Sequence, residues 1–381
     1  MSVRALNRAT LGRQLLLRRE SVDVPQAVRR LVALQAQHPA SPYLALWNRL
    51  SPFDPRLLDD AFTAREVVKG NVPRMTLHAV HVEDYRAFRE ALEPSLHGAK
   101  LGPRFTVSGL TAADADALVP PLLDHAEQPR TAAGCEAWLR ERLGAAATPG
   151  AWWGLRQYAP LWRAPTAAPW SFDSRLSYVA PVPRPVLADA DAAAAGLRTL
   201  AHRYLLAFGP ASVADLALFA QVQRSRARTA VLALGDALEQ LQGPDGSVLY
   251  DVPGAVRPAE DTPAPPRLLG MWDNVLLAHV DRGRVIPPGY RAHVTRSNGD
   301  VLPTLLVDGF VAGVWRAVDG GIEATAFHRL TDETWQALAA EARSLLSLLT
   351  GRDPAVYRRY DHWWTSLPRA EVRMLRGEAQ T

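Results

Sequence analysis

Residues 197–238 read LRTLAHRYLLAFGPASVADLALFAQVQRSRARTAVLALGDAL and carry the clearest structural pattern in the chain. One helical pattern ends at Gly209-Pro210, Ser212 is placed to cap the short helix VADLALFA, and a basic helix follows a tight turn. Residues 238–254, LEQLQGPDGSVLYDVPG, place Pro244-Asp245-Gly246 at the tip of a predicted hairpin. Helices followed by such a hairpin are typical of a winged helix.

The same order of elements is predicted twice upstream. Residues 6–37 hold two helical patterns, the second with Asp23 as its N-cap and Pro25 in its first turn. A third helix is predicted within residues 54–68 and a strand within residues 72–82. The next copy is predicted to contain helices at 111–126, 131–143 and 150–159 and a strand at 171–181. Three successive units of this kind indicate tandem winged helices.

The pattern changes after about residue 259. Alternating apolar runs meet at Asp308-Gly309 and Gly320-Gly321, which predicts a small antiparallel β-barrel. Residues 334–351 are expected to form a helix against it, and residues 358–368 to trail away. The predicted fold class is therefore α+β. Its predicted domains are winged helices at 1–98, 99–185 and 186–258, and a barrel with a C-terminal helix at 259–381.

Composition limits the class of protein. The 381 residues are 48% hydrophobic and carry a formal charge of +4, and of 43 basic residues only Lys69 and Lys100 are lysines. Arginine suits phosphates and base edges, although the codon usage of a GC-rich genome explains the same bias. The single cysteine, Cys135, excludes an intramolecular disulfide and a multi-cysteine zinc site. No apolar run is long enough for a signal core or a membrane span, so we expect a soluble, cytoplasmic protein.

Several familiar catalytic motifs are absent. The sequence contains no phosphate-binding G-x-x-x-x-G-K-[ST] loop, no G-x-S-x-G elbow and no H-E-x-x-H pair. His78 and His81 lack neighbouring cysteines or a second histidine pair, so they are interpreted as strand-end residues and no metal is expected. Lys69, beside Gly70, is interpreted as a loop residue and a poor Schiff-base candidate. No organic cofactor is predicted either.

Gln35-Ala36-Gln37 is a pair of neutral amides at what looks like a helix end. Residues two apart on a helix point away from each other, but the residue before Pro39 is disfavoured in helical geometry. If the chain is already extended there, both amides project from one side and form a paired donor and acceptor site. The alternative is that Gln35 caps helix carbonyls while Gln37 is solvated.

Five segments in the same order carry a resemblance to a known family: QAQ, PRMTLHAV, YLLAFGPASVADLALFA, LLGMWDNVLLAHVDRGRV and LLVDGFVAGVWR. Together they resemble the winged-helix DNA glycosylases of the azinomycin-resistance type (AlkZ-like), from about residue 4 to about residue 365. The resemblance implies three tandem winged helices and a barrel around a concave DNA channel. It also implies that Gln35 and Gln37 are catalytic. Gln37, where one branch has aspartate, places the chain with the antibiotic self-resistance branch, whereas Met75 stands where the family often has glycine.

The implied reaction is consistent with two amides. A purine alkylated at N7 or N3 is cationic and leaves with little acid assistance, so the enzyme mainly has to reach the nucleotide, place a water and stabilise an oxocarbenium sugar. We therefore predict a monofunctional bacterial glycosylase without lyase activity, acting in base excision repair of DNA damage on bulky or crosslinking N-alkylpurines. Its partner would be alkylated double-stranded DNA, which it would bind as a monomer and away from any membrane.

The residues expected to contact DNA are basic, amide or aromatic side chains. They are Arg74 and His78 of the first wing, Arg224, Arg226 and Arg228 of the basic helix, the run Trp272, Asp273 and Asn274, then Arg282, Arg284, Arg296 and Asn298. For most of them a solvated helix face, a core position or a simple turn is the competing interpretation. Gln221-Val222-Gln223 repeats the glutamine spacing but is interpreted as a decoy, because no helix-ending proline follows.

Two other functions remain open from the sequence. A non-catalytic winged-helix transcriptional regulator would bind intact duplex DNA in a sequence-specific manner, usually as a dimer. A toxin-sequestering protein would bind the free genotoxin without DNA.

Overall fold

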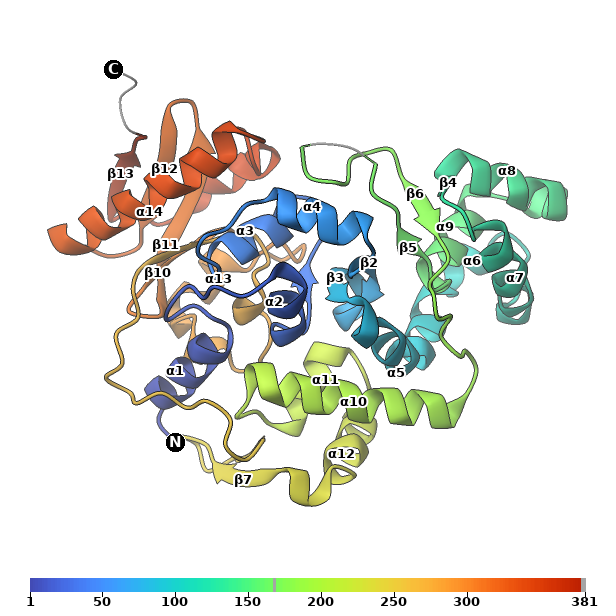
Figure 1. Cartoon of the computed structure of the whole chain (residues 1–381), viewed down its shortest axis with the longest axis horizontal. Helices are drawn as coiled ribbons and strands as arrows, with labels where there is room; N and C mark the ends of the chain where they lie inside the picture. The colour runs from blue at the N-terminus through green and yellow to red at the C-terminus, as the bar shows by residue number, and fades with distance from the viewer. Residues whose placement is uncertain (167–168, 378–381) are drawn as a thin grey trace.

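The computed structural model describes residues 1–166 and 169–377, apart from the side chain of Arg104. Within these residues the chain forms a mixed fold of helices and antiparallel sheets (Figure 1). Two large hydrophobic cores hold it together. One joins the N-terminal segment to the C-terminal sheet, and the other joins the strands within residues 67–81 to the two middle segments.

The N-terminal segment contains the glutamine pair on a short strand. Its elements are α1 (Val3–Arg13), α2 (Val24–Arg30), β1 (Leu34–Gln35), α3 (Ser41–Trp47), α4 (Arg56–Thr63), β2 (Val67–Val72) and β3 (Thr76–His81). Asp23 caps α2 as predicted, because its side chain accepts from the N–H of Gln26 at 2.7 Å. The helix ends earlier than the predicted pattern, at Arg30, and Val32 takes a left-handed conformation with φ of 70° before the chain becomes extended.

Two local predictions in this segment are wrong. The helix expected over residues 54–68 ends at Thr63, since Arg65 has φ of 61° and the β-branched pair Val67-Val68 enters β2. No helix was predicted for residues 41–47, where the structure forms α3. Pro42 lies in the first turn of α3, where a missing N–H is tolerated.

The second segment begins with a long helix that crosses the predicted boundary between residues 98 and 99. Its elements are α5 (Val82–Lys100), α6 (Pro103–Thr106), α7 (Ala112–His125), β4 (Arg130–Thr131), α8 (Ala132–Leu143), α9 (Pro149–Tyr158), β5 (Trp162–Arg163) and β6 (Ser177–Val179). The strands of the first two segments form one six-stranded sheet in the order β1-β3-β2-β5-β6-β4. The two segments are therefore joined through the pairing of β2 with β5.

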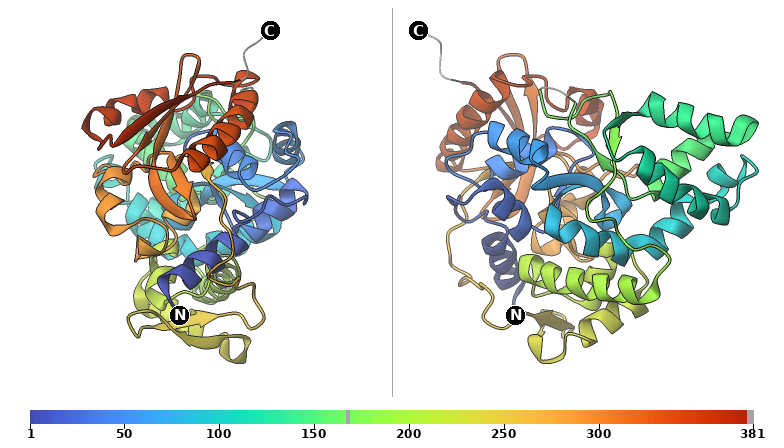
Figure 2. Two further views of the ribbon diagram at one scale, coloured as in Figure 1. Left: turned by 90° about the vertical axis from the view of Figure 1, so that its left-hand side faces the viewer. Right: turned by 45° about the vertical axis from the view of Figure 1, so that its right-hand side comes forward.

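The third segment follows its sequence pattern closely. It contains α10 (Ala190–Phe208), α11 (Val213–Ala220), α12 (Arg224–Leu232), β7 (Glu239–Gln242) and β8 (Val248–Asp251). Ser212 caps α11 in a reciprocal capping box with Asp215. The β7–β8 hairpin turns at residues 243–247 and lies beside the N-terminus, at the opposite end of the molecule from the C-terminus (Figures 1 and 2).

The C-terminal segment is an antiparallel sheet covered by a helix. It contains β9 (Arg267–Leu269), α13 (Arg291–Val294), β10 (Thr304–Val307), β11 (Phe310–Val318), β12 (Gly321–Ala326), α14 (Asp332–Thr350) and β13 (Glu371–Leu375). The strand order is β13-β12-β11-β10-β9, and among the described residues no ladder joins the two end strands. Helix α14 packs on this sheet (Figure 2). Residues 358–366, expected to trail away, instead form a 3₁₀ helix that buries Tyr360 and Trp364.

One order of elements occurs three times along the chain: helix, strand, helix, helix, strand, strand. In each case the last strand is central, giving β1-β3-β2, β4-β6-β5 and, through a bridge from Ala211 to Tyr250, Ala211-β8-β7. The three segments thus share an internal topology although their sequences differ.

Candidate active site

Gln35 and Gln37 lie on and just after β1, in extended rather than helical chain. Strand β1 pairs with β3, so that Gln35 is opposite His78, and the N–H of Ala36 donates to Leu77 O at 2.9 Å. Gln35 Nε2 donates to Gln37 Oε1 at 2.5 Å, while the Gln37 backbone N–H donates to Gln35 Oε1 at 3.1 Å. The two amides therefore hold one another, with Gln35 buried and Gln37 exposed.

His78, opposite Gln35 on β3, forms a hydrogen bond with Arg74. The N–H of His78 Nδ1 donates to Thr76 O at 3.1 Å, which leaves Nε2 as the acceptor for Arg74 Nη2, also at 3.1 Å. Burial and the neighbouring Arg74 charge keep the pKa of His78 well below its usual value, so the imidazole is neutral. Arg74 and Met75 both have left-handed backbone, with φ of 56° and 54°, at the turn between β2 and β3. Met75 thus occupies a position that suits glycine.

His38, directly after Gln37, faces a group of aromatic rings. Its ring meets the Tyr357 ring edge-on at 4.7 Å between centroids and lies 6.5 Å from that of Tyr360. Burial, with smaller effects from the charges of Arg359 and Lys69, lowers the pKa of His38 to about 4. The residue next to the amide pair is therefore uncharged at neutral pH. No local sequence signal points to the two tyrosines, because they lie more than 300 positions away.

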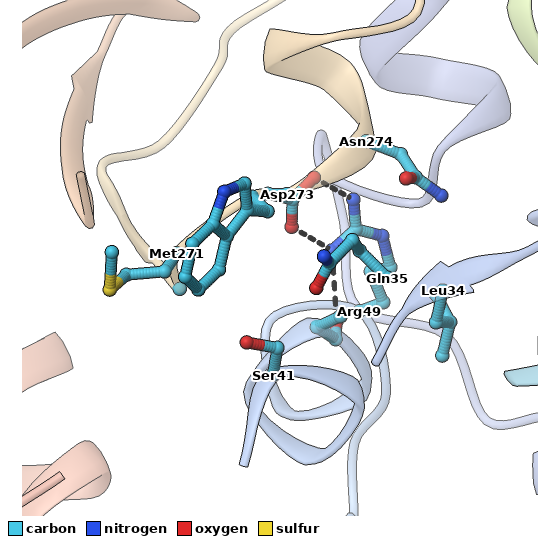
Figure 3. Close-up of a pocket in the computed structure, with 10 residues that line it drawn as sticks. Leu34, Gln35, Ser41, Arg49, Met271, Asp273 and Asn274 are labelled. Atoms are coloured by element: carbon cyan, nitrogen blue, oxygen red, sulfur yellow. Dashed lines mark hydrogen bonds and ion pairs between the residues drawn. The ribbon is translucent and has the colours of Figure 1, made fainter. Parts of the chain in front are cut away.

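A small cavity lies beside Gln35 (Figure 3). Its volume is about 10 Å³, enough for roughly one water molecule. Across it, Arg49 forms a buried two-pronged ion pair with Asp273, at 2.7 and 2.8 Å, and also donates to Ala45 O. The cavity is lined by Leu34, Gln35, Ser41, Ala45, Arg49, Gly270, Met271, Trp272, Asp273 and Asn274.

Residues 272–274 and strand β3, both expected to contribute contacts to DNA, thus meet at the glutamine pair. Asn274 Nδ2 donates to Ala33 O, which ties this loop to β1. Trp272 Nε1 donates to Gly299 O at 3.0 Å, so the turn that carries Arg296 and Asn298 lies against the same loop. Segments more than 200 residues apart in sequence are brought together here.

Comparisons with known proteins identify the family of this chain. The sequence model of a family described as DNA glycosylase AlkZ-like matches residues 28–348. The chain belongs to the AlkZ-like DNA glycosylase family. The solved structure of Streptomyces sahachiroi DNA glycosylase AlkZ is similar, with a TM-score of 0.78 and 20% identity, over 91% of this chain and 96% of that one. A comparison with curated proteins found no match.

These findings confirm the predicted family. Membership supports a DNA glycosylase enzyme that acts on DNA in repair, and the structural match shows that the AlkZ-like chain shares the fold of that solved glycosylase. In the part of the chain that the structure describes, no helix has the length and apolarity needed to cross a membrane.

The remaining predicted residues of the AlkZ-like chain lie apart from the amide pair or inside the protein. Arg224 and Arg228 are exposed on α12 and line a separate pocket of about 510 Å³. Arg226 donates to Ala91 O at 3.2 Å. Arg282 donates to Thr295 Oγ1 at 2.9 Å and is close enough to Arg74 to lower its pKa.

Arg284 differs most from its expected role as a phosphate contact. It is buried, and its Nη1 donates to Pro210 O at 3.1 Å and Thr10 Oγ1 at 3.4 Å. In this conformation the guanidinium joins α1 to the third segment and is not presented to a DNA backbone.

Proposed function

We propose that this AlkZ-like protein is a monofunctional DNA glycosylase that hydrolyses the N-glycosidic bond of cationic N-alkylpurines, with bulky or crosslinking adducts as its lesions. The observation that carries the proposal is the amide pair of Gln35 and Gln37, fixed by β1 and β3 next to a water-sized cavity. No metal or organic cofactor takes part in the proposed reaction. The regulator considered above is not favoured, because the family is one of enzymes.

The geometry gives the two glutamines different roles. Gln37 Oε1 already accepts one hydrogen bond from Gln35, and a carbonyl oxygen has a second lone pair. Because Gln37 is exposed, that lone pair can accept from a water and orient it toward C1′ of the damaged nucleotide. Gln35, buried beneath it, fixes the direction of the Gln37 amide. Gln37 is then the catalytic residue and Gln35 the positioning residue.

The two histidines and the ion pair beside the amides add no net charge, whereas Arg74, bonded to His78, keeps its positive charge. His38 and His78 are neutral, and the Arg49 charge is balanced by Asp273. An alkylated purine and an oxocarbenium sugar therefore meet no unpaired cation from the histidines or the ion pair. A neutral base would need a proton on departure, and amides cannot supply one. The site thus favours bases that are already charged.

We propose no lyase activity, because the sheet separates the side chain of Lys69 from that of Gln35. Lys69 is opposite Ala79, which is opposite Leu34, whereas Gln35 is opposite His78. Because neighbouring residues on a strand point to opposite faces, Lys69 and Gln35 project from different sides of the sheet. No Schiff base from Lys69 is expected at the sugar bound beside the amides.

We further propose that the three repeated segments are winged helices and that the open C-terminal sheet with α14 takes the place of the predicted barrel. Together they would bind duplex DNA as a monomer, with Arg224, Arg228, Arg296 and Asn298 as candidate contacts on exposed or partly exposed surface. Phosphate contacts of this kind should make binding weaken with salt.

The test is single-turnover base release from labelled duplexes that carry either N7-methylguanine, a bulky N7 adduct, or the neutral lesions uracil and hypoxanthine. We expect release of both cationic bases, an intact abasic site that breaks only on treatment with alkali, and no release of the neutral bases. Equal release of uracil would contradict the proposed chemistry. No release from any duplex, with tight binding to undamaged DNA, would restore the regulator.

A further inference from the structure

Lys69 is not the loop residue that its neighbour Gly70 suggested. It lies in the middle of β2, is only 5% exposed, and its Nζ is 4.3 Å from the centroid of the Phe172 ring. No carboxylate among the described residues forms an ion pair with it. A buried ammonium without a counter-ion is costly, since unpaired charges are rarely taken out of water.

A second cation stands directly beside it. The pairing of β2 with β5 places Arg163 opposite Lys69, and like charges directly opposite on neighbouring strands are destabilising. Arg163 lies over the Tyr178 ring at 4.2 Å, and its Nη1 is buried without a hydrogen-bond partner in the described part of the chain. The strand register therefore puts two under-satisfied cations side by side.

Both cations line one pocket. It has a volume of about 270 Å³ and lies between the end of α4 and strands β5 and β6, where the first two segments meet. Arg65 adds a third cation at its wall, and none of the residues that line it is acidic. The wall is completed by Phe62, Thr63, Val67, Val68, Pro129, Trp162, Ala164, Pro165 and Val179.

We propose that this pocket is an anion site that binds a phosphate group. A phosphate would supply the missing counter-charge to Lys69 and the acceptor that Arg163 lacks, since both side chains bind phosphate oxygens readily. The phosphate comes either from free phosphate or from the DNA backbone. Because the side chains of Lys69 and Gln35 project from opposite faces of the sheet, the site does not depend on the proposed glycosylase chemistry.

The pH dependence follows from the groups that surround Lys69. Burial, with a smaller effect from Arg163, lowers the pKa of Lys69 to about 7. The other charged or titratable groups nearby are Arg65, which lines the same pocket, and His38, whose own pKa is lowered partly by Lys69. A bound anion favours the ammonium form, so binding weakens as the pH rises above about 7. Sulfate is the suitable probe for this profile, because it does not titrate in that range.

The first experiment uses the full chain and reductive methylation with formaldehyde, followed by mass spectrometry of the two lysines. Lys100 is the internal reference. Rates are compared in chloride, sulfate and phosphate at equal ionic strength, and with undamaged duplex DNA. We expect saturating sulfate or phosphate to slow methylation of Lys69 by about tenfold and to leave Lys100 unchanged. Protection by duplex as well would identify the DNA backbone as the source, and protection by free anions alone would identify free phosphate.

The second experiment compares thermal unfolding of Lys69→Met with Lys100→Met as the matched control. Lys69→Met should melt at a higher temperature than wild type in chloride and should lose the rise that sulfate causes. Lys100→Met should keep that rise. The proposal would be overturned if Lys69 were methylated at the same rate in all three salts and with duplex, or were not methylated at all in chloride. It would also be overturned if sulfate raised the melting temperature of Lys69→Met as much as that of the wild type. If Lys69→Met does not fold, the methylation rates of the wild type decide.

Discussion

The chain contains two copies of the same tripeptide pattern, Gln35-Ala36-Gln37 and Gln221-Val222-Gln223, and they fold differently. In the first, the glutamines flank a buried alanine at a strand and bond to each other. In the second, Gln221 ends α11 with φ of 53° and its amide donates to Leu218 O at 2.9 Å, while Gln223 begins α12 without capping it. Both glutamines of the second copy are exposed.

Because both copies have the same spacing, the contact between Gln35 and Gln37 depends on the pairing of β1 with β3 and not on the spacing. Gln35 pairs with β3 and shares a small cavity with residues 271–274, whereas the second copy connects two helices at the surface. Only the first pattern holds its two glutamines against each other. The distinction can be tested by changing each copy in turn.

The largest difference is expected in catalysis. Gln35→Ala combined with Gln37→Ala should lower single-turnover release of N7-methylguanine by about 10³-fold, because the water loses its acceptor and its orientation. The matched control, Gln221→Ala with Gln223→Ala, should release the base at the wild-type rate. Both proteins should be checked for an unchanged unfolding midpoint. Equal rates in the two variants would remove the functional distinction between the copies.

The next effect concerns the ion pair across the cavity. Arg49→Met should lower the free energy of unfolding by about 3 kcal/mol, since Asp273 is left buried without its partner. We expect the low end of the usual range, because Asp273 still accepts from the Val275 N–H. Denaturant unfolding measures this loss in the free energy of unfolding. The control is Arg226→Met, because the guanidinium of Arg226, near the second copy, bonds one backbone carbonyl. This change should lower the free energy of unfolding much less.

Local patterns predicted much of the fold. The third segment carried its own caps, helix stop and hairpin turn, so its elements could be located from neighbouring residues. The shared six-stranded sheet could not be located in this way, because the pairing of Lys69 with Arg163 joins strands about ninety positions apart and no local signal sets that register. For the same reason Lys69 seemed to be a loop residue.

The candidate site shows the same division. Gln35 and Gln37 can be identified as candidate site residues from the Gln-Ala-Gln pattern and the family resemblance. Residues 272–274 can be identified from a motif of the same family. The cavity that joins them depends on Arg49, which has no distinctive sequence context, and His38 was noticed only because it precedes a proline. Arg284 shows the opposite failure, since an arginine in a basic stretch proved to be buried.

The third effect depends on the residue after each tripeptide, His38 in the first and Arg224 in the second. The pKa of His38 is lowered from 6.5 to about 4, so the unfolded chain takes up a proton before the folded one. Its contribution to the free energy of unfolding, about 3 kcal/mol for a shift of this size, is fully present above pH 6.5 and is lost as the pH falls toward 4. His38→Gln should therefore flatten the pH dependence of unfolding in this window, whereas Arg224→Gln should leave it unchanged. Base release per folded molecule should stay constant between pH 6 and 8, because neither amide titrates.

The smallest effect, with the opposite sign, is expected at Gln221. A left-handed residue after a helix is most favourable as glycine, which has no Cβ to strain, and the exposed amide of Gln221 contributes little. Gln221→Gly should therefore raise the free energy of unfolding by about 0.5–1 kcal/mol, measured by denaturant unfolding, without changing base release. The matched change Gln35→Gly should lower both stability and base release, because it removes a buried side chain from a paired strand. If Gln221→Gly destabilised the protein, the second copy would hold a structural contact that the hydrogen bond to Leu218 does not explain.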